Sequence, residues 1–292
     1  MPALPTPRQI LETLLPVLKT AGAYAHHIQE RIARHPDKYN SDNLFANALT
    51  DADLSVQTFI EVTLLAHFPE LRFHGEEYEK AYNTKYFRAI DLGPTGDYLV
   101  TLDPIDGTRF YMDGHPNYQV ILTVLNADGF EAVVAISPAL DRFYYTLRGQ
   151  GTFAGTLTDT LETCQPLQIV TPKNNVMLGW RMGPLAEHLP TPYQAIDVHR
   201  DYSQMTPIPS VNGLLTGDVA GVVLSRAKFI DGAALAFMAQ EMGYILTDHT
   251  GQTLPPPAAC ENMNWPGIVV AANETLHQQL LTALTKIDPP EL

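Results

Sequence analysis

The hexapeptide Asp103–Thr108 reads DPIDGT and directly follows an apolar stretch. Two aspartates three positions apart on a turn can direct their carboxylates into one pocket. Gly107 permits a tight turn or the close approach of a ligand to the backbone. The N–H groups of Gly107 and Thr108, at the start of an expected helix, are placed to donate to a phosphate oxygen. The alternative is a turn in which these residues serve backbone geometry alone.

Three further acidic segments have the residue types of a metal or acid–base site. Gly75–Glu77 reads GEE, although adjacent glutamates are more often solvated surface residues than ligands. Asp53 stands three positions after Thr50, and this pattern also fits a capping box in which Asp53 completes a helix start. Asp231 opens an apolar helix, where an aspartate commonly acts as a cap or as a partner of the helix dipole.

The order and spacing of these segments resemble the inositol monophosphatase superfamily, which also contains fructose bisphosphatases and nucleotide 3′-phosphatases. That family has, in order, Thr-x-x-Asp before a helix, Gly-Glu-Glu, Asp-Pro-Ile/Leu-Asp-Gly-Thr, and Trp-Asp-x-Ala-Ala/Gly opening a helix that ends in Glu-Ala-Gly-Gly. The resemblance covers about residues 45 to 280, and the hexapeptide is specific because so many fixed positions rarely match by chance. The matching segments here are Thr50–Asp53, Gly75–Glu77, Asp103–Thr108, Ile230–Ala234 and Glu241–Tyr244, with Phe68-Pro69, Arg148–Phe153 and Ala271–Asn273 as further family features.

The resemblance implies a magnesium-dependent, lithium-sensitive phosphatase, and its site residues carry over position by position. The implied magnesium ligands are Glu76, Asp103, the Ile105 carbonyl, Asp106 and Asp231, with Asp103 shared by two ions. The implied catalytic residues are Asp53 and Thr108, which would orient and deprotonate the attacking water, together with Glu76. The implied phosphate-binding residues are Asp106, Gly107 and Thr108.

The chemistry of magnesium agrees with this set of residues. Mg²⁺ prefers hard oxygen ligands, and a few carboxylates with a substrate phosphate are its usual partners in proteins. Phosphoryl transfer depends on positioning and on charge stabilisation more than on covalent help from the protein. We therefore expect hydrolysis of a small phosphomonoester. The alternative is a catalytically weak member that acts as a metal- or ligand-binding or regulatory module, although clustered carboxylates are costly to hold together without cations.

The chain departs from the family pattern on the substrate side. Inositol-selective members have an acidic residue seven positions before the late aspartate, and this chain has Leu224 there. The upstream Arg-Ser-x-Gly-Ser/Thr segment is absent, with Arg200–Ser203 in its approximate place. Ile230 replaces the family Trp, and we expect it to pack without chemical consequence. The sequence therefore leaves inositol phosphates, sugar phosphates and nucleotide phosphates all open as substrates.

The elements that must position these residues follow from apolar periodicity. A helical stripe begins after Thr6-Pro7 and includes Pro16, which is expected to kink or split the helix. A second helix is expected at about residues 51–67, with Phe59 among its inward residues. Apolar strands and turns then predict a run of antiparallel strands from residue 98 onward. This pattern indicates an α+β domain over residues 1–165 that carries most of the metal ligands.

Beyond residue 165 the expected strands and helices alternate. Strands at 176–180, 219–224, 244–247 and 268–272, with helices at 231–242 and 274–286, predict an α/β domain over residues 166–292. This domain would carry the late aspartate and the substrate pocket. By resemblance, the two domains would form the layered α-β-α-β-α sandwich of inositol monophosphatases, and the protein would be a homodimer.

Composition limits the partners and the compartment. The 292 residues carry a formal net charge of −14, which makes a nucleic-acid polymer a poor partner and leaves a small phosphorylated metabolite dependent on bound cations. Apolar runs fall short of the roughly 20 residues that a membrane span needs. The N-terminus lacks the pattern of a secretion signal. Two cysteines far apart, Cys164 and Cys260, fit a reducing cytoplasm.

Overall fold

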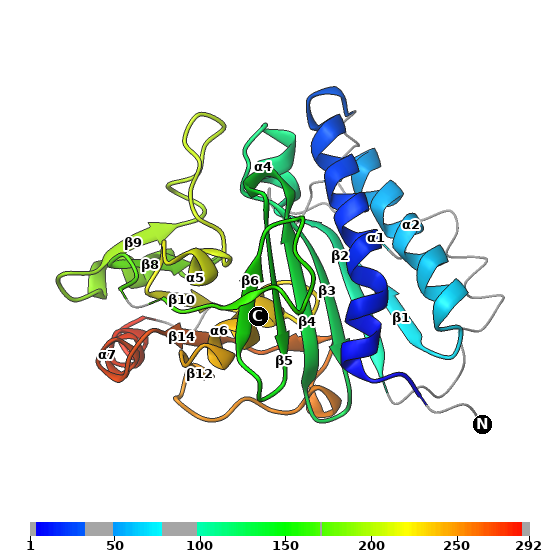
Figure 1. Ribbon diagram of the computed structural model, residues 1–292. Coiled ribbons are helices and arrows are strands. Elements are labelled where there is room, and N and C mark those ends of the chain that lie inside the picture. The colour runs from blue at the N-terminus through cyan, green and yellow to red at the C-terminus, as the bar shows by residue number, and fades with distance from the viewer. Residues whose placement is uncertain (1–3, 33–48, 78–97, 170, 288–292) are drawn as a thin grey trace. The chain divides into compact units, whose positions relative to one another are not determined.

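The computed structural model describes residues 4–32, 49–77, 98–169 and 171–287 (Figure 1). The chain divides into two compact units. The first unit comprises Met1–Arg148 and Phe153–Gln165, and the second comprises Gly149–Thr152 and Pro166–Leu292. Each unit is organised around a β-sheet with helices packed on it, and each is described below by itself.

The first unit begins with two long helices. Helix α1 (Pro7–Ile28) starts at a Thr6 cap whose side chain and Gln9 form a capping box, with Pro7 in the first turn. Pro16 lies inside α1, and the helix is continuous through it, so the expected split does not occur. Helix α2 (Asp51–His67) has the length that the sequence predicts. The two helices lie side by side over one face of the sheet (Figure 1).

The first sheet has the strand order β1-β2-β3-β4-β5-β6-β7. Strands β2 to β5 pair antiparallel, as expected, but β1 runs parallel to β2. A parallel neighbour requires a long connection, and the segment of residues 76–98 between the two strands provides one. The strands are β1 (Arg72–Gly75), β2 (Leu99–Asp106), β3 (Gln119–Leu125), β4 (Phe130–Ser137), β5 (Arg142–Leu147), β6 (Thr152–Gly155) and β7 (Gln165–Pro166).

One core joins α1, α2 and the inner face of this sheet. From α1 it contains the stripe around Leu11, Leu14 and Leu18, and from α2 it contains Val56 and Ile60. The expectation that Phe59 points inward is wrong, because its side chain is 45% exposed. Part of the buried face of α2 is polar instead: it comprises Asp53, Gln57 and Glu61, spaced four residues apart.

The second unit has a mixed sheet in the order β12-β14-β10-β8-β9. Strands β8, β9 and β10 are mutually parallel, and β14 pairs antiparallel with β10 and β12. On β10, Val223 packs in the cluster that includes Leu276 and Leu280 of α7, while Leu224 faces Gly232 of α6. Neighbouring strand residues point to opposite faces, so α6 and α7 cover opposite faces of this sheet. The bounds are β8 (Asn175–Leu178), β9 (Gln194–Asp197), β10 (Gly221–Leu224), β12 (Ile245–Thr247), β14 (Ile268–Ala271), α6 (Gly232–Glu241) and α7 (Glu274–Leu284).

Shorter elements complete the described chain. They are η1 (Gln29–Arg31), α4 (Thr108–Met112), η2 (Pro138–Leu140), η3 (Gly183–His188), α5 (Gly213–Thr216), η4 (Pro257–Ala259) and the paired strands β11 (Ala227–Lys228) and β13 (Asn264–Trp265). None of the helices in the described ranges is both long and apolar enough to cross a membrane.

Candidate active site

The parallel pairing of β1 and β2 brings two of the predicted metal ligands next to each other, directly after the last paired residues of the two strands. The register pairs Gly75 with Leu102, and the Glu76 N–H donates to the Leu102 carbonyl at 2.9 Å. Glu76 and Asp103 are therefore the residues that come directly after the last pair of the β1–β2 register. The Asp103 side chain is buried, with 3% of its surface exposed.

The DPIDGT segment forms the end of β2 and the turn into α4. The pairing of β2 with β3 is irregular between Asp103 and Asp106, and Asp103 Oδ1 accepts from the Ile105 N–H at 3.1 Å. Gly107 has a φ of +84°, and a Cβ on it would lie 3.0 Å from the Asn117 carbonyl oxygen. Both the left-handed backbone and the close approach favour glycine at this turn.

Asp106 has a hydrogen-bond partner that lies outside the sequence motifs. Gln119, at the start of β3, donates from Nε2 to Asp106 Oδ2 at 2.8 Å. The register places these two residues opposite each other on β2 and β3. A hydrogen bond to one oxygen fixes the rotation of the carboxylate, so Gln119 orients Asp106. A single sequence contains no signal that would pair two residues 13 positions apart on facing strands.

Asp53 takes part in both of the arrangements that the sequence left open. Its Oδ2 accepts from the Thr50 N–H at 2.8 Å and from the Thr50 hydroxyl at 2.7 Å, which completes the capping box of α2. Its Oδ1 lies 3.2 Å from the Thr108 hydroxyl. That hydroxyl also lies 2.8 Å from the Ile105 carbonyl, so its single proton has two acceptors within reach. The capping role and the contact with Thr108 therefore coexist in one buried carboxylate.

Asp231 belongs to the second unit. It caps α6, with Oδ1 accepting from the Gly232 N–H, as the helix-start interpretation predicts. Its Oδ2 lies 4.0 Å from Lys228 Nζ, and both side chains are partly exposed. Ile230 is buried, in agreement with the expected packing role. Asp231 therefore has a lysine as its neighbour.

Leu224, at the position where inositol-selective relatives have an acid, fills space between two glycines. A Cβ on Gly179 would lie 2.7 Å from Leu224 Cδ2, and a Cβ on Gly232 would lie 2.9 Å from Leu224 Cδ1. The backbone oxygen of Leu224 lies 2.8 Å from His249 Nε2, and burial lowers the pKa of that histidine. The Leu224 side chain is therefore a packed apolar element.

The residues of the first unit have the donor chemistry that Mg²⁺ prefers. Glu76, Asp103 and Asp106 offer carboxylate oxygens, and the Ile105 carbonyl is close to the same turn. Among the described residues, no three His, Cys, Asp or Glu side chains come close enough to form a ready metal centre. Two of the carboxylates are held by other groups, Asp103 by the Ile105 N–H and Asp106 by Gln119. The donor set fits a hard cation.

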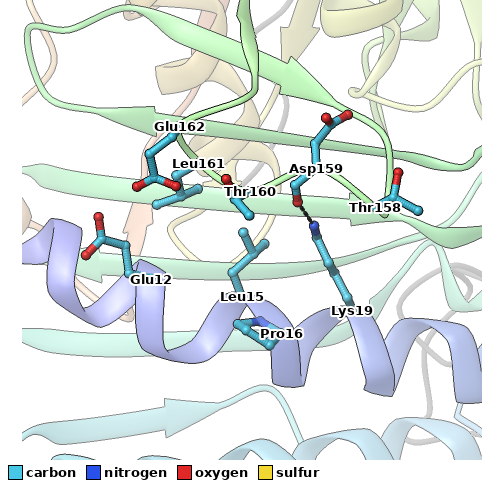
Figure 2. A pocket seen from close by; sticks show the side chains of 9 residues that line it. All are labelled: Glu12, Leu15, Pro16, Lys19, Thr158, Asp159, Thr160, Leu161 and Glu162. Carbon is cyan, nitrogen blue, oxygen red and sulfur yellow. Dashed lines mark hydrogen bonds between the residues drawn. The ribbon is translucent and has the colours of Figure 1, made fainter.

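A pocket of about 470 Å³ in the first unit lies at a different place, between α1 and the turn at residues 158–162 (Figure 2). Lys19 projects toward this turn and donates to the Asp159 carbonyl, with its Nζ 4.2 Å from the centre of the Phe143 ring. Burial lowers the pKa of the Lys19 ammonium. The residues lining this pocket include none of the predicted site residues.

Comparison with known proteins agrees with the fold and the motifs. The model of the inositol monophosphatase family matches residues 10–288, and the chain belongs to this family. The histidinol-phosphatase of Mycobacterium tuberculosis is 27% identical over 242 residues, which cover 81% of this chain and 84% of that protein. Relatives of this chain thus include named phosphatases.

Solved structures share the architecture. An inositol monophosphatase of Thermotoga maritima superimposes with a TM-score of 0.70 at 18% identity, covering 95% of this chain and 97% of that one. A protein described as an inositol monophosphatase/NADP phosphatase, solved with Mg²⁺ and phosphate, gives a TM-score of 0.64 at 16% identity, with 94% and 95% covered. These likenesses confirm the predicted fold class.

Proposed function

We propose that this protein is a magnesium-dependent phosphatase of small phosphomonoesters. The observation that carries the proposal is the contact between Asp53 Oδ1 and the Thr108 hydroxyl, within the turn that follows Asp103 and Asp106. A hydroxyl beside a buried carboxylate, on the turn that carries proposed metal ligands, is suited to relay a proton from an attacking water. Inositol phosphates, sugar phosphates and nucleotide phosphates are the candidate substrates.

Each residue has a distinct proposed role. The ligands of Mg²⁺ would be Glu76, Asp103, the Ile105 carbonyl and Asp106 of the first unit and Asp231 of the second. When bound, the cation supplies charge stabilisation for the phosphoryl group and activates water. The N–H groups of Gly107 and Thr108 would bind phosphate oxygens directly, and Asp106 would do so through the cation that it holds. Thr108 and Asp53 would orient the water and accept its proton. Glu76, directly after β1, would assist them.

The orientation of Asp53 supports a role as proton acceptor. Both donors of Thr50 bind the same oxygen, Oδ2, so the rotation of the carboxylate is fixed and Oδ1 faces Thr108. Such fixed positioning favours catalysis because little reorganisation accompanies the reaction. Thr108 itself is buried at the start of α4, so its hydroxyl is held in place by the same turn that positions the aspartates.

The metal requirement tests this proposal directly. Phosphate release from a panel of phosphomonoesters should require Mg²⁺, disappear with a chelator and return when magnesium is added. Lithium and calcium should inhibit, as the family resemblance implies. Full activity in excess chelator would exclude the metal mechanism. A chain that binds Mg²⁺ but releases no phosphate from any substrate would instead favour the ligand-binding or regulatory module.

The compartment and the oligomeric state belong to the same proposal. A cytoplasmic homodimer fits the family, and both cysteines, Cys164 and Cys260, are free thiols. Burial raises the pKa of Cys164 to about 11, so this thiol is not a reactive thiolate near neutral pH. Light scattering coupled to gel filtration at several concentrations would measure the oligomeric state.

A further inference from the structure

The face of α2 that packs toward the sheet carries a line of buried polar side chains. Asp53, Gln57 and Glu61 follow one another at intervals of four residues, and each is at most 2% exposed. A helix that covers a sheet normally presents apolar residues there, and buried polar groups persist where they have partners. The active-site proposal accounts for Asp53. It leaves Gln57 and Glu61 unexplained.

Gln57 binds the backbone of the Gly-Glu-Glu turn. Its Oε1 accepts from the Glu77 N–H at 2.8 Å. A Cβ on Gly75 would lie 2.3 Å from the same Oε1 and 2.4 Å from Gln57 Cδ, so the carboxamide rests directly on the glycine. Gly75 does not have a positive φ, so what favours glycine there is this close approach: a side chain at this position would have to displace the Gln57 carboxamide. The first residue of the motif is therefore explained by a side chain of α2.

Glu61 orients the Gln57 amide. Gln57 Nε2 donates to Glu61 Oε1 at 2.9 Å, which directs the amide oxygen of Gln57 toward the turn. Glu61 Oε2 is buried and makes no hydrogen bond with the residues that the structure describes. A glutamate in such a place lowers stability, because its desolvation is only partly compensated. Within the described ranges, the hydrogen bond that the Glu61 side chain makes is the one that aligns Gln57.

The other side of the turn is fixed by β2. The Glu76 N–H donates to the Leu102 carbonyl, the residue before Asp103, and the next N–H along the chain donates to Gln57. Two consecutive N–H groups are thus bound by different elements, β2 and α2. The backbone that carries the Glu76 carboxylate is held between these two contacts, next to the part of β2 where Asp103 lies.

We propose that Gln57 and Glu61 are positioning residues that hold the Gly75–Glu77 turn, and through it the Glu76 carboxylate, in the geometry needed to bind a divalent cation. This inference rests on the proposed function in taking Glu76 as a ligand. Side chains that orient metal ligands typically change metal affinity by about 10- to 100-fold when they are replaced. Gln57 and Glu61 would act in this way from outside the family motifs.

The test compares variants of α2 by two measurements, Mg²⁺ affinity by calorimetry without substrate and thermal unfolding in chelator. Gln57→Met keeps the length of the side chain and removes both hydrogen bonds. We expect it to weaken Mg²⁺ binding by about 10- to 100-fold. Val56→Ala is the matched control, since Val56 is buried on the same helix without polar contacts. It should lower the unfolding temperature and leave the Mg²⁺ affinity within about two-fold.

A second pair of variants covers the case in which Gln57→Met fails to fold. Glu61→Gln retains an oxygen acceptor for Gln57 Nε2 and should bind Mg²⁺ within about three-fold of wild type. Glu61→Met removes the acceptor and should weaken binding by about ten-fold. Equal Mg²⁺ affinity in Glu61→Met, Glu61→Gln and wild type would overturn the proposal, as would an equal loss in Val56→Ala.

The outcomes also separate this inference from the proposed function. If wild type binds Mg²⁺ and the Gln57 variant does not, while no phosphomonoester is hydrolysed, the positioning role stands and the phosphatase assignment fails. If wild type is an active phosphatase and Gln57→Met binds Mg²⁺ normally, the positioning role fails and the phosphatase assignment stands. A wild-type protein that binds no divalent cation would overturn both.

Discussion

The two units hold their acidic residues in different ways. In the first unit Asp53 and Asp103 are buried, and backbone or side-chain donors fix the rotation of Asp53, Asp103 and Asp106. In the second unit Asp231 is a partly exposed helix cap with a lysine 4.0 Å away. The first arrangement is rigid and costly to build. The second is an ordinary helix start.

The difference extends to the surroundings of each region. The first unit retains the family hexapeptide and supports it with polar side chains from α2 and β3, such as Gln57 and Gln119. The second unit has Leu224 packed between two glycines where inositol-selective relatives have an acid. We infer that the first unit retains the chemistry of the family and that the second has diverged in what it selects. Four predictions test this contrast.

The largest expected effect is in the first unit. If Asp53 were only a helix cap, Asp53→Asn would lower stability by at most about 1 kcal/mol, because Asn still accepts a backbone N–H. If Asp53 accepts a proton through Thr108, the variant should lose about 10²- to 10⁴-fold in kcat. Thr108→Val should lose a similar factor, and the double variant should be little worse than either single one because the two residues act together.

Steady-state kinetics with Mg²⁺ titration would separate this effect from loss of the metal. Both variants should retain most of their Mg²⁺ affinity. Asp103→Asn is the contrasting change, since it should weaken Mg²⁺ binding itself. If Asp53→Asn keeps more than about half of the wild-type turnover, the catalytic role of Asp53 is wrong and the helix cap alone remains.

The second prediction concerns the buried polar face of α2. Burial raises the pKa of Glu61 to about 7, from 4.5 in the unfolded chain. The folded state therefore binds more protons than the unfolded state between these values, so stability should fall as pH rises from about 4.5 to 7. A shift of this size corresponds to about 3 kcal/mol in total, most of which is lost above pH 5.

Urea unfolding at pH 5 and pH 8 would measure the contribution of Glu61. Glu61→Gln removes the ionisable group, so its stability relative to wild type should rise by about 2 to 3 kcal/mol between the two pH values. A wild-type and a Glu61→Gln protein with parallel pH dependence would show that Glu61 ionises normally.

How far the sequence leads can be seen from particular residues. The helix at about residues 51–67 and the run of antiparallel strands from residue 98 onward follow from local patterns, and both occur. Local patterns do not contain the direction of β1, which depends on a long connection. Those patterns predict an antiparallel sheet, whereas the parallel pairing of β1 with β2 is what places Glu76 beside Asp103.

The residues that support the site are not predicted by the apolar pattern of the sequence. Gln57 and Glu61 are buried on the face of α2 where periodicity favours apolar side chains. Phe59, which the apolar pattern predicts to be inward, is exposed. The interval of four residues from Asp53 was the available signal, since it places all three on one side of a helix. Gln119 had no local signal, because its partner Asp106 is opposite only in the folded sheet.

The third prediction concerns selectivity. Leu224 offers no polar atom from its side chain, which packs against Gly179 and Gly232. We expect that myo-inositol 1-phosphate is not strongly preferred. Its kcat/KM should lie within about 100-fold of that for the best sugar phosphate or nucleotide, which is roughly 2.7 kcal/mol. A larger preference would show that other residues replace the missing acid.

The smallest expected effect concerns Lys228. Its ammonium is 4.0 Å from Asp231 Oδ2, and both side chains are partly exposed, so the pair contributes about 0.2 to 1 kcal/mol to stability. If Asp231 is a magnesium ligand, the same ammonium competes with the cation for that oxygen. Lys228→Met retains the aliphatic stem and removes the charge. It should therefore tighten Mg²⁺ binding by about 1.5- to 5-fold while lowering the unfolding temperature slightly in chelator.

The two readouts move in opposite directions only if Asp231 binds the metal. If Asp231 is a helix cap alone, Lys228→Met should lower stability slightly and leave the Mg²⁺ affinity unchanged. If Lys228 instead contacts the substrate phosphate, KM should rise with no change in the calorimetric Mg²⁺ affinity. Lys228→Arg, which keeps the charge, is the control and should match wild type in Mg²⁺ affinity. Tighter Mg²⁺ binding in Lys228→Met alone would therefore place Asp231 among the ligands, although its surroundings in the second unit are those of an ordinary cap.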